Sequence, residues 1–314
     1  MHAARQLMVR QKYKEAAELI NSRLRENPND FHALYTLVTI EQTRILDYES
    51  YTIDGRRFIA LSDSVRKVLD NSLRSLRGED SLAALFYSAN LLGGAGLIQA
   101  KCSEWFSGAR NAMASANLLR QVKRVDPNHL GADLGIGTFE YYFGTSLKWI
   151  PFVSGGNVER GIEAVERSLD APFPFNYAAK STYCWILIDR KQYKKADSLA
   201  RSVLVQYPGN SVFLRIRALI ALWSGDYKSA LPFGEKVVEI AEKRAPVNWS
   251  DLVMGYYIII KSHEHFGHKD KAFAAAQKAL SIQIPAAFRN IPHVKDNLKY
   301  ISDIHSKYNR AQNR

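Results

Sequence analysis

The sequence predicts an all-α protein, a right-handed α-solenoid of helix-turn-helix repeats. Apolar residues recur with the period of a helix along nearly the whole chain, and prolines separate these apolar stretches. One pattern also returns after 34 residues, a period typical of repeat arrays. The 314 residues exceed a usual single globular domain and no Gly/Ser-rich linker divides them, so one array spanning 1–314 accounts for the length.

The 34-residue spacing is most visible in the C-terminal half of the chain. The segment "QYKKADSLARSVLVQYPGN" at 192–210 aligns with "DYKSALPFGEKVVEIAEKR" at 226–244, so that Tyr193 matches Tyr227. A similar phrase, "KYKEAAELINSRLRENPND", begins at Lys12. We therefore expect regular repeats at 177–210, 211–244 and 253–286.

Small and aromatic residues occupy matching places in these repeats. They are Cys184, Tyr193, Ala196 and Pro208 in the first repeat, Ala218, Gly225, Tyr227 and Ala230 in the second, and Gly267, Ala272 and Ala279 in the third. The arrangement resembles the tetratricopeptide repeat (TPR) family, with departures at Lys191, Glu242 and a late Pro285. This resemblance implies antiparallel helix pairs that meet at the small residues, and a concave groove for protein or peptide partners.

The stretch "LGIGTFEYYFG", which begins at Leu134, contains a GxG motif. A phosphate-binding loop of this kind needs a preceding strand and a third glycine, but Glu140 stands in the place of the third glycine and a helix end precedes the stretch. In the repeat numbering Gly135 instead falls on a small-residue position, and Gly161 falls on the corresponding position of the partner helix. We therefore predict that glycines here allow two helices to pack closely.

The repeat at 128–176 is longer than the others and is expected to carry an insert at about 142–155. The insert contains "LKWIPFV" at 147–153, whose Trp149 and Phe152 are candidate contacts for a protein partner or a membrane surface. The alternative is that the insert folds back and plugs the groove of the solenoid.

The remaining chain is expected to form irregular repeats over 1–127 and a C-terminal capping helix over 292–309. Helical periodicity in the N-terminal part covers 31–46, 57–76, 81–99 and 109–125, and the region 47–78 fits the 34-residue period poorly. A capping helix with a polar outer face is what a stacked array needs for solubility.

A narrower resemblance covers 131–169. The order "GxGxxxYYxG", "WIP" and "GGN…RGIEAV" is similar to the TPR family that contains the eukaryotic inclusion-body-clearance proteins and bacterial relatives. Asn157 replaces the acid usual in that family, and Glu159 displaces the arginine to Arg160. The resemblance implies a link to lipid droplets and protein clearance.

The composition and the motifs argue against several classes of function. Lys and Arg outnumber acids by 43 to 31, but the bases are spread along the chain without a nucleic-acid-reading motif, so no nucleic-acid partner is expected. Cys102 and Cys184 form no CxxC pair, and "SHEHFGH" at 262–268 lacks the HExxH spacing. No catalytic motif occurs, so we expect a non-enzyme without metal or cofactor.

The groove of the predicted solenoid offers candidate partner contacts. In TPR arrays the first helix of each repeat lines the groove. The groove-lining positions of these helices carry Phe139, Trp185, Arg215, Tyr257 and Lys261. Aromatic side chains next to Arg and Lys suit an extended peptide with an acidic residue. The alternative is that many of these residues simply pack on neighbouring helices.

Two functions follow from these observations. The first is a non-catalytic scaffold that binds a protein through its groove, and the second is a membrane-peripheral or lipid-handling protein that uses the insert. The first repeat would begin about four residues before Met1. Either its first helix is short, or the chain is a fragment, or a longer N-terminus precedes it, which would have room for a signal peptide or lipoprotein anchor. Cytoplasmic location is the default without such a segment.

Overall fold

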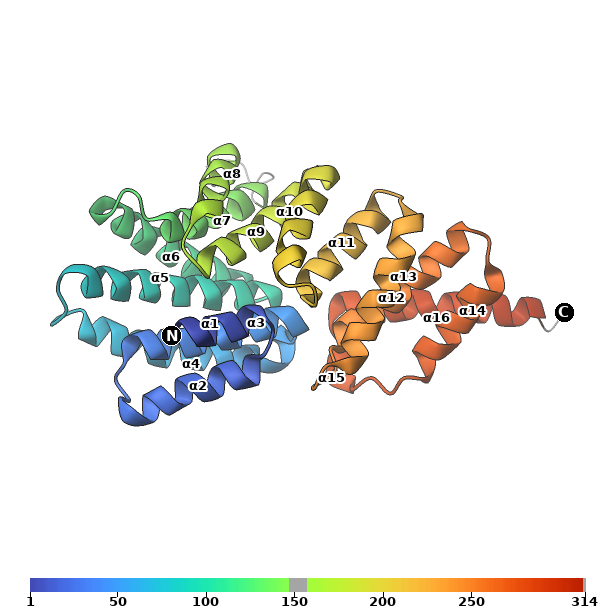
Figure 1. Ribbon diagram of the computed structural model, residues 1–314, viewed down its shortest axis with the longest axis horizontal. Coiled ribbons are helices and arrows are strands. Elements are labelled where there is room, and N and C mark those ends of the chain that lie inside the picture. Colours follow the sequence, from blue (N-terminus) through green and yellow to red (C-terminus); the bar gives the residue numbers. More distant parts are fainter. Residues whose placement is uncertain (147–156, 313–314) are drawn as a thin grey trace. The chain divides into compact units, whose positions relative to one another are not determined.

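The computed structural model describes residues 1–146 and 157–312, and within these ranges the chain is helical without strands (Figure 1), which confirms the predicted all-α class. The helices are α1 (His2–Val9), α2 (Tyr13–Glu26), α3 (Phe31–Tyr48), α4 (Tyr51–Ser72), α5 (Gly78–Lys101), α6 (Trp105–Val125), α7 (Leu130–Ser146), α8 (Val158–Arg167), α9 (Phe175–Asp189), α10 (Tyr193–Gln206), α11 (Ser211–Trp223), α12 (Tyr227–Lys243), α13 (Trp249–His265), α14 (Lys269–Ser281), α15 (Ala286–Arg289) and α16 (Pro292–Gln312), with a 3₁₀ turn at Ser168–Asp170.

Helix starts and ends follow the repeat pattern. α10 and α12 begin at Tyr193 and Tyr227, the two tyrosines that the 34-residue spacing aligns. α2, α6 and α10 each end two residues before a proline, at Pro28, Pro127 and Pro208. Proline cannot continue a helix and disfavours helical geometry in the residue before it, so the sequence predicts these helix ends.

Glycines bring paired helices into contact, as predicted for α7 and α8. A Cβ on Gly137 would lie 2.6 Å from the carbonyl oxygen of Gly161, and a Cβ on Gly161 would lie 2.7 Å from the backbone nitrogen of Tyr141. A Cβ on Gly135 would meet the side chain of Leu119 on α6 at 2.4 Å. These glycines therefore serve helix packing, which offsets the roughly 1 kcal/mol that a glycine costs inside a helix.

Two further helix pairs also come into close contact at glycines. Gly96 on α5 faces Gly108 on α6, where a Cβ on either residue would come within 2.9 Å of the other's carbonyl oxygen. Gly234 on α12 and Gly255 on α13 approach each other in the same way. The sequence analysis found neither of these two pairs.

One expected boundary differs from the structure, and the region that fits the 34-residue period poorly has the long helix expected there. α7 continues to Ser146, so residues 142–146 of the expected insert are helical, and the rest of the insert up to Gly156 lies outside the described residues. The poorly fitting region after residue 47 is a long helix, α4, which follows α3 after a break at Glu49 and Ser50. Glu49 has a φ of 52°, a left-handed conformation that ends α3.

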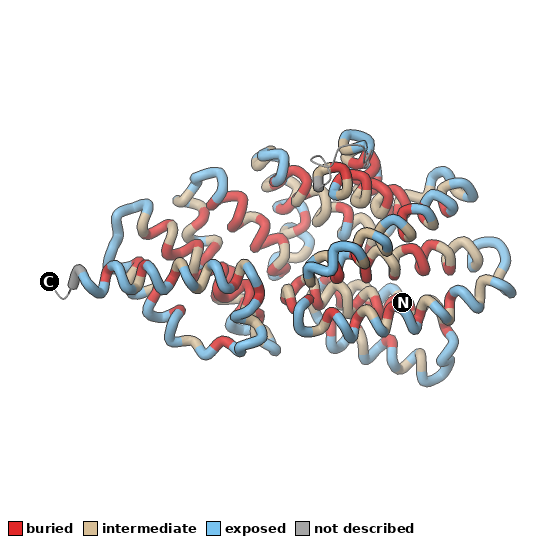
Figure 2. The backbone as a smooth tube through the Cα atoms, turned by 180° about the vertical axis from the view of Figure 1, so that it is seen from behind, coloured by how far each residue is buried: buried red, intermediate tan, exposed pale blue. Residues whose placement is uncertain are grey.

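The described helices group into two compact units. Unit 1 comprises residues 1–46 and 54–186, and unit 2 comprises residues 47–53 and the chain from Leu187 onward. In Figure 2 buried and exposed residues alternate along most helices, as expected for helices that bury one face. The single array over 1–314 and its repeat boundaries remain predictions.

One helix, α5, is long and apolar enough by composition to cross a membrane. Within its most apolar window 56% of the residues are buried inside the structure, and α5 packs along α6 at the glycine contact described above. These contacts are those of a core helix of unit 1.

In unit 2 the C-terminal helix α16 packs against α13 and α14. Its apolar residues Val294, Ile301 and Ile304 are buried, whereas most of its other side chains face solvent. α16 thus covers the end of the helix array, as expected of the predicted capping helix.

Candidate protein-binding surfaces

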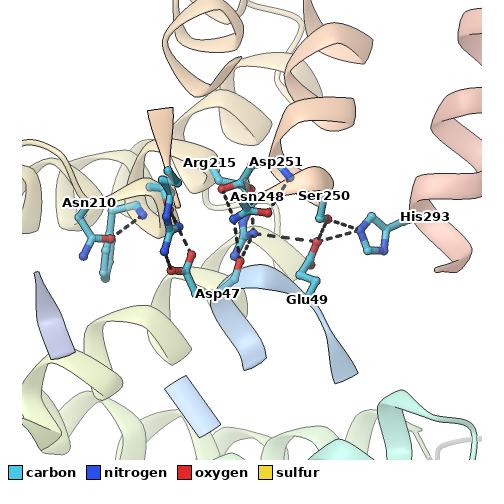
Figure 3. A network of polar contacts seen from close by, with 11 residues as sticks. Asp47, Glu49, Asn210, Arg215, Asn248, Ser250, Asp251 and His293 are labelled. Atoms are coloured by element: carbon cyan, nitrogen blue, oxygen red, sulfur yellow. Dashed lines mark hydrogen bonds and ion pairs between the residues drawn. The ribbon is translucent and has the colours of Figure 1, made fainter. Parts of the chain in front are cut away.

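A buried polar cluster lies in unit 2, where α11 and α13 begin (Figure 3). Asn210 and Asn248 cap these two helices, because the side-chain oxygen of each accepts the backbone N–H three residues further along. Arg215 lies one turn inside α11 and Asp251 in the first turn of α13, and their side chains form an ion pair at 2.8 Å. Both side chains are buried, so each depends on the other for compensation of its charge.

The segment 47–53 enters this cluster through Asp47. The backbone carbonyl oxygen of Asp47 accepts hydrogen bonds from Arg215 at 3.1 Å and from Asn248 at 3.2 Å. Its carboxylate accepts a hydrogen bond from Arg244 at 2.7 Å. The segment is therefore held by charge-assisted hydrogen bonds to both its backbone and its side chain.

Glu49 extends the cluster toward α16. Its carboxylate lies 2.7 Å from Nε2 of His293 and accepts a hydrogen bond from Ser250 (Figure 3). Burial alone would raise the pKa of Glu49, but Arg215, His293 and Ser250 together lower it to about 2. Glu49 is thus ionised and paired over the whole neutral range.

Asp251 behaves differently from Glu49 although it faces the same arginine. Its complete burial, reinforced by the charges of Asp47 and Glu49, raises the pKa of Asp251 to about 6 against the opposing effect of Arg215. Three carboxylates therefore share two guanidinium groups, the buried one of Arg215 and the half-buried one of Arg244.

Arg215, one of the predicted groove residues, lies within this cluster. Arg215 is only 5% exposed, and its guanidinium is paired with acids of its own chain. The sequence analysis expected an acidic peptide beside Arg215, and an acidic segment does lie there, but it is the protein's own segment 47–53. Sequence patterns could not reveal this contact because Asp47 and Arg215 are 168 residues apart.

Two other predicted groove residues, Tyr257 and Lys261, come together on α13 but contact α16. The ammonium group of Lys261 lies 4.1 Å from the ring centroid of Tyr300, and the rings of Tyr257 and Tyr300 form an edge-to-face pair at 5.1 Å. Glu264, one turn further along α13, accepts hydrogen bonds from Tyr300 and, at 3.0 Å, from Tyr308. Both predicted residues therefore face the capping helix.

Phe139 lies on a face of α7 that stays partly open. Phe139, Tyr142 and Phe143 are three and four residues apart, which places them on one side of the helix, and we call them the aromatic stripe. The rings of Phe139 and Phe143 stack at 4.8 Å, and the guanidinium of Arg120 lies 5.9 Å from the centre of Phe139. Tyr142 is 43% exposed, and the two phenylalanines are half-buried.

For the other predicted site residues the structure gives less information about partner binding. Trp185 lies on α9 in unit 1 and is half-buried. Trp149 and Phe152, the candidate contacts of the insert, lie outside the described residues. Contacts of these three residues with a partner, and a membrane role for the insert, remain predictions.

The sequence analysis did not identify the most exposed aromatic residues of the described chain. Trp105 is 66% exposed and Phe106 is 95% exposed, at the very start of α6. The sequence could have indicated their exposure, because both residues precede the stretch 109–125, whose apolar residues follow a helical period. Two large aromatic residues outside that period point away from the helix pair.

Comparisons with known proteins find distant likenesses among solved structures. Neither a protein-family model nor a curated protein matches this sequence. Among solved structures, the chain is similar to the C-terminal part of a TPR repeat-containing protein from Cytophaga hutchinsonii, with 18% identity, a TM-score of 0.43, and coverage of 91% of this chain and 97% of that one. It is also similar to a tetratricopeptide repeat protein from Parabacteroides merdae, with 15% identity, a TM-score of 0.45 and 96% coverage of both chains.

A third similar structure is yeast Tom70, with 7% identity, a TM-score of 0.39, and coverage of 96% of this chain and 87% of that one. Likenesses at these scores are too distant to transfer any property to this chain. The helix pairs, the 34-residue spacing and the glycine contacts are themselves the evidence that the chain has the helix-pair repeat fold of TPR proteins. The narrower resemblance to the inclusion-body-clearance family stays a prediction.

Proposed function

We propose that this protein is a non-catalytic repeat scaffold that binds a protein partner, and that the aromatic stripe on α7 is part of its binding surface. The observation that carries the proposal is the partial exposure of Tyr142 beside the stacked pair of Phe139 and Phe143. Large aromatic side chains that remain accessible on the surface of a folded protein are typical centres of protein interfaces.

The stripe has physical properties that favour binding. α7 is fixed along its length because Gly137 and Gly161 lock it to α8, so the aromatic rings project from a rigid support. The ring stack and the nearby Arg120 further restrict Phe139. A partner would therefore lose little conformational entropy from this side of the interface on binding.

The predicted groove residues of unit 2 do not contribute in the same way. Arg215, Tyr257 and Lys261 already contact segment 47–53 or α16. A partner could reach them only by displacing parts of this protein. We therefore base the proposal on the stripe and on Trp185, both of which belong to unit 1.

Cross-linked affinity capture from native lysate tests the proposal. Wild type, a Phe139→Ala/Tyr142→Ser variant and a Val205→Ser control are compared side by side. Val205 is an exposed apolar residue on α10, so its replacement removes apolar surface elsewhere. We expect wild type and the control to capture one common protein, and the stripe variant to lose it by at least about tenfold, because two truncated hot-spot residues cost roughly 2 kcal/mol or more.

The reverse pattern contradicts the proposal. If the stripe variant retains every protein that wild type captures, while its circular dichroism and melting temperature match those of wild type, the stripe is not a binding surface. A variant that melts at lower temperature is replaced by Tyr142→Ser alone, since that side chain is the most exposed of the three.

A further inference from the structure

The turn between α5 and α6 presents two adjacent aromatic side chains to solvent. Phe106 is 95% exposed and Trp105 is 66% exposed, more than any other aromatic residue among the exposed large apolar side chains of the described chain. Leaving two such side chains in water forgoes a large hydrophobic stabilisation. The fold does not need them there, because α5 and α6 are already held together by the contact of Gly96 with Gly108.

The turn is a narrow tip. α5 ends at Lys101 and α6 begins at Trp105, so the connection is short, and Ser103 adopts a left-handed φ of 65° to make the reversal. The two helices are in close contact just before the tip, where a Cβ on Gly108 would lie 3.1 Å from the backbone nitrogen of Ala100. The aromatic pair therefore stands at the end of a tightly closed helical hairpin.

Basic residues surround the tip. Lys101 and Arg110 lie on either side of the aromatic pair in the chain, and both are exposed. The start of α4 adds Arg56, since its neighbour Gly55 lies against Ile98 of α5 and against Cys102, the residue that follows α5. Burial and the charge of Glu104 raise the pKa of the Cys102 thiol while Arg56 opposes the rise, which places both charges beside the turn. Three exposed cations thus accompany one exposed acid.

We propose that this tip, residues 101–110 with Arg56, is an anchor for an anionic lipid surface. Trp and Phe at the end of a hairpin can enter the boundary between headgroups and acyl chains, and tryptophan favours that depth in particular. Lys101, Arg110 and Arg56 then lie at the level of the negative headgroups and attract them. This anchor is separate from the aromatic stripe and does not depend on protein binding there.

A bilayer fits the tip better than a protein partner does. A stable protein interface buries about 800 Å² on each partner and needs a broad complementary surface. A short turn with two exposed aromatic side chains offers far less area, whereas a bilayer accepts a small wedge of any outline. The basic surroundings select an anionic membrane over a neutral one.

Vesicle co-sedimentation of the full-length protein tests this anchor. Wild type is mixed with vesicles of phosphatidylcholine alone or of phosphatidylcholine with phosphatidylglycerol. We expect it to pellet with the anionic vesicles only. Trp105→Ser/Phe106→Ser should weaken this binding at least about tenfold, because two aromatic side chains no longer leave water.

Two control variants separate the aromatic and charged contributions. Trp223→Ser removes a 49% exposed tryptophan at the end of α11 and should bind as wild type does. Lys101→Gln/Arg110→Gln should lose about fivefold for each base on anionic vesicles, and added salt should reduce wild-type binding in parallel.

Three results would overturn the inference. They are no binding of wild type to anionic vesicles, equal binding to both vesicle types, and unchanged binding of the Trp105→Ser/Phe106→Ser variant. All substituted side chains are exposed, so circular dichroism and melting temperature should match those of wild type. A shared loss of structure is thereby distinguished from loss of the anchor.

Discussion

Asp47 is the residue on which most of the buried cluster in unit 2 depends. Its backbone and side chain together receive hydrogen bonds from Arg215, Asn248, Ser211 and Arg244. Buried charges of this kind are costly when unpaired, even though an intact pair adds little net stability. Removal of the Asp47 carboxylate should therefore reveal how far unit 2 relies on segment 47–53.

Asp47→Ala should lower the free energy of unfolding by about 3–5 kcal/mol, because the half-buried Arg244 and the buried Ser211 both lose this acceptor. Lys243→Ala, which breaks an exposed pair with Glu239 at 2.8 Å, should have a much smaller effect, because solvent screens exposed ion pairs. Denaturant unfolding measures both values. Equal effects of the two substitutions would contradict the assignment of Asp47 as the centre of the cluster.

The pKa of Asp251 makes a prediction about pH. Because this pKa is raised from 3.8 to about 6, the folded state binds the proton more tightly than the unfolded chain. The resulting stability is present below about pH 4 and is lost as the pH rises to about 6. We expect wild type to lose up to about 3 kcal/mol relative to Asp251→Asn across this interval, as measured by denaturant unfolding at a series of pH values.

Glu49 should show the opposite dependence. Its pKa is lowered from 4.5 to about 2, so its stabilising effect is present above pH 4.5 and is lost as the pH falls toward 2. Relative to Glu49→Gln, wild type should therefore lose stability on acidification within that window. If both variants differ from wild type by a constant amount at all pH values, the account of these carboxylates is wrong.

At the scale of helices, the glycine contacts decide how closely pairs approach. Gly137 and Gly161, Gly96 and Gly108, and Gly234 and Gly255 each let one backbone touch another. The close approach of α7 and α8 was predictable because Gly161 falls on a small-residue position of the repeat. Its contact is Gly137, however, whereas Gly135, the predicted counterpart, meets Leu119 of α6. The partners of the other glycines were missed because a lone glycine in a helix does not indicate which neighbour it touches.

Gly137→Ala should destabilise the protein by roughly 2–3 kcal/mol, since the added Cβ would lie 2.6 Å from the carbonyl oxygen of Gly161 and force α7 and α8 apart. Gly209→Ala is the matched control. No atom lies within 4 Å of its added Cβ, so we expect little change or a gain of about 0.5 kcal/mol. A thermal melt of each variant provides the comparison, and a harmless Gly137→Ala would contradict the packing role.

The helices themselves could be predicted from the sequence because local rules govern them. Proline stops mark the ends of α2, α6 and α10, and the aligned tyrosines mark the starts of α10 and α12. The site residues could not be predicted equally well. The burial of Arg215 depends on a segment far away in the chain, and the exposure of Trp105 depends on how tightly its hairpin closes.

At the scale of the whole molecule, the two compact units carry different surfaces. Unit 1 holds the aromatic stripe and the exposed tip of α5 and α6, whereas unit 2 has its predicted groove residues in contact with segment 47–53 and α16. We therefore propose that partner binding occurs on unit 1. The central claim is that the α7 stripe touches a protein partner in the native environment.

Site-specific photo-crosslinking tests this claim most directly. A photoreactive phenylalanine analogue is placed at Tyr142, at the open edge of the stripe, and in a second variant at Val205 on α10. Irradiation in the native host should give a discrete cross-linked protein from position 142 and none from position 205. No adduct at position 142, or the same adducts at both positions, would contradict the account.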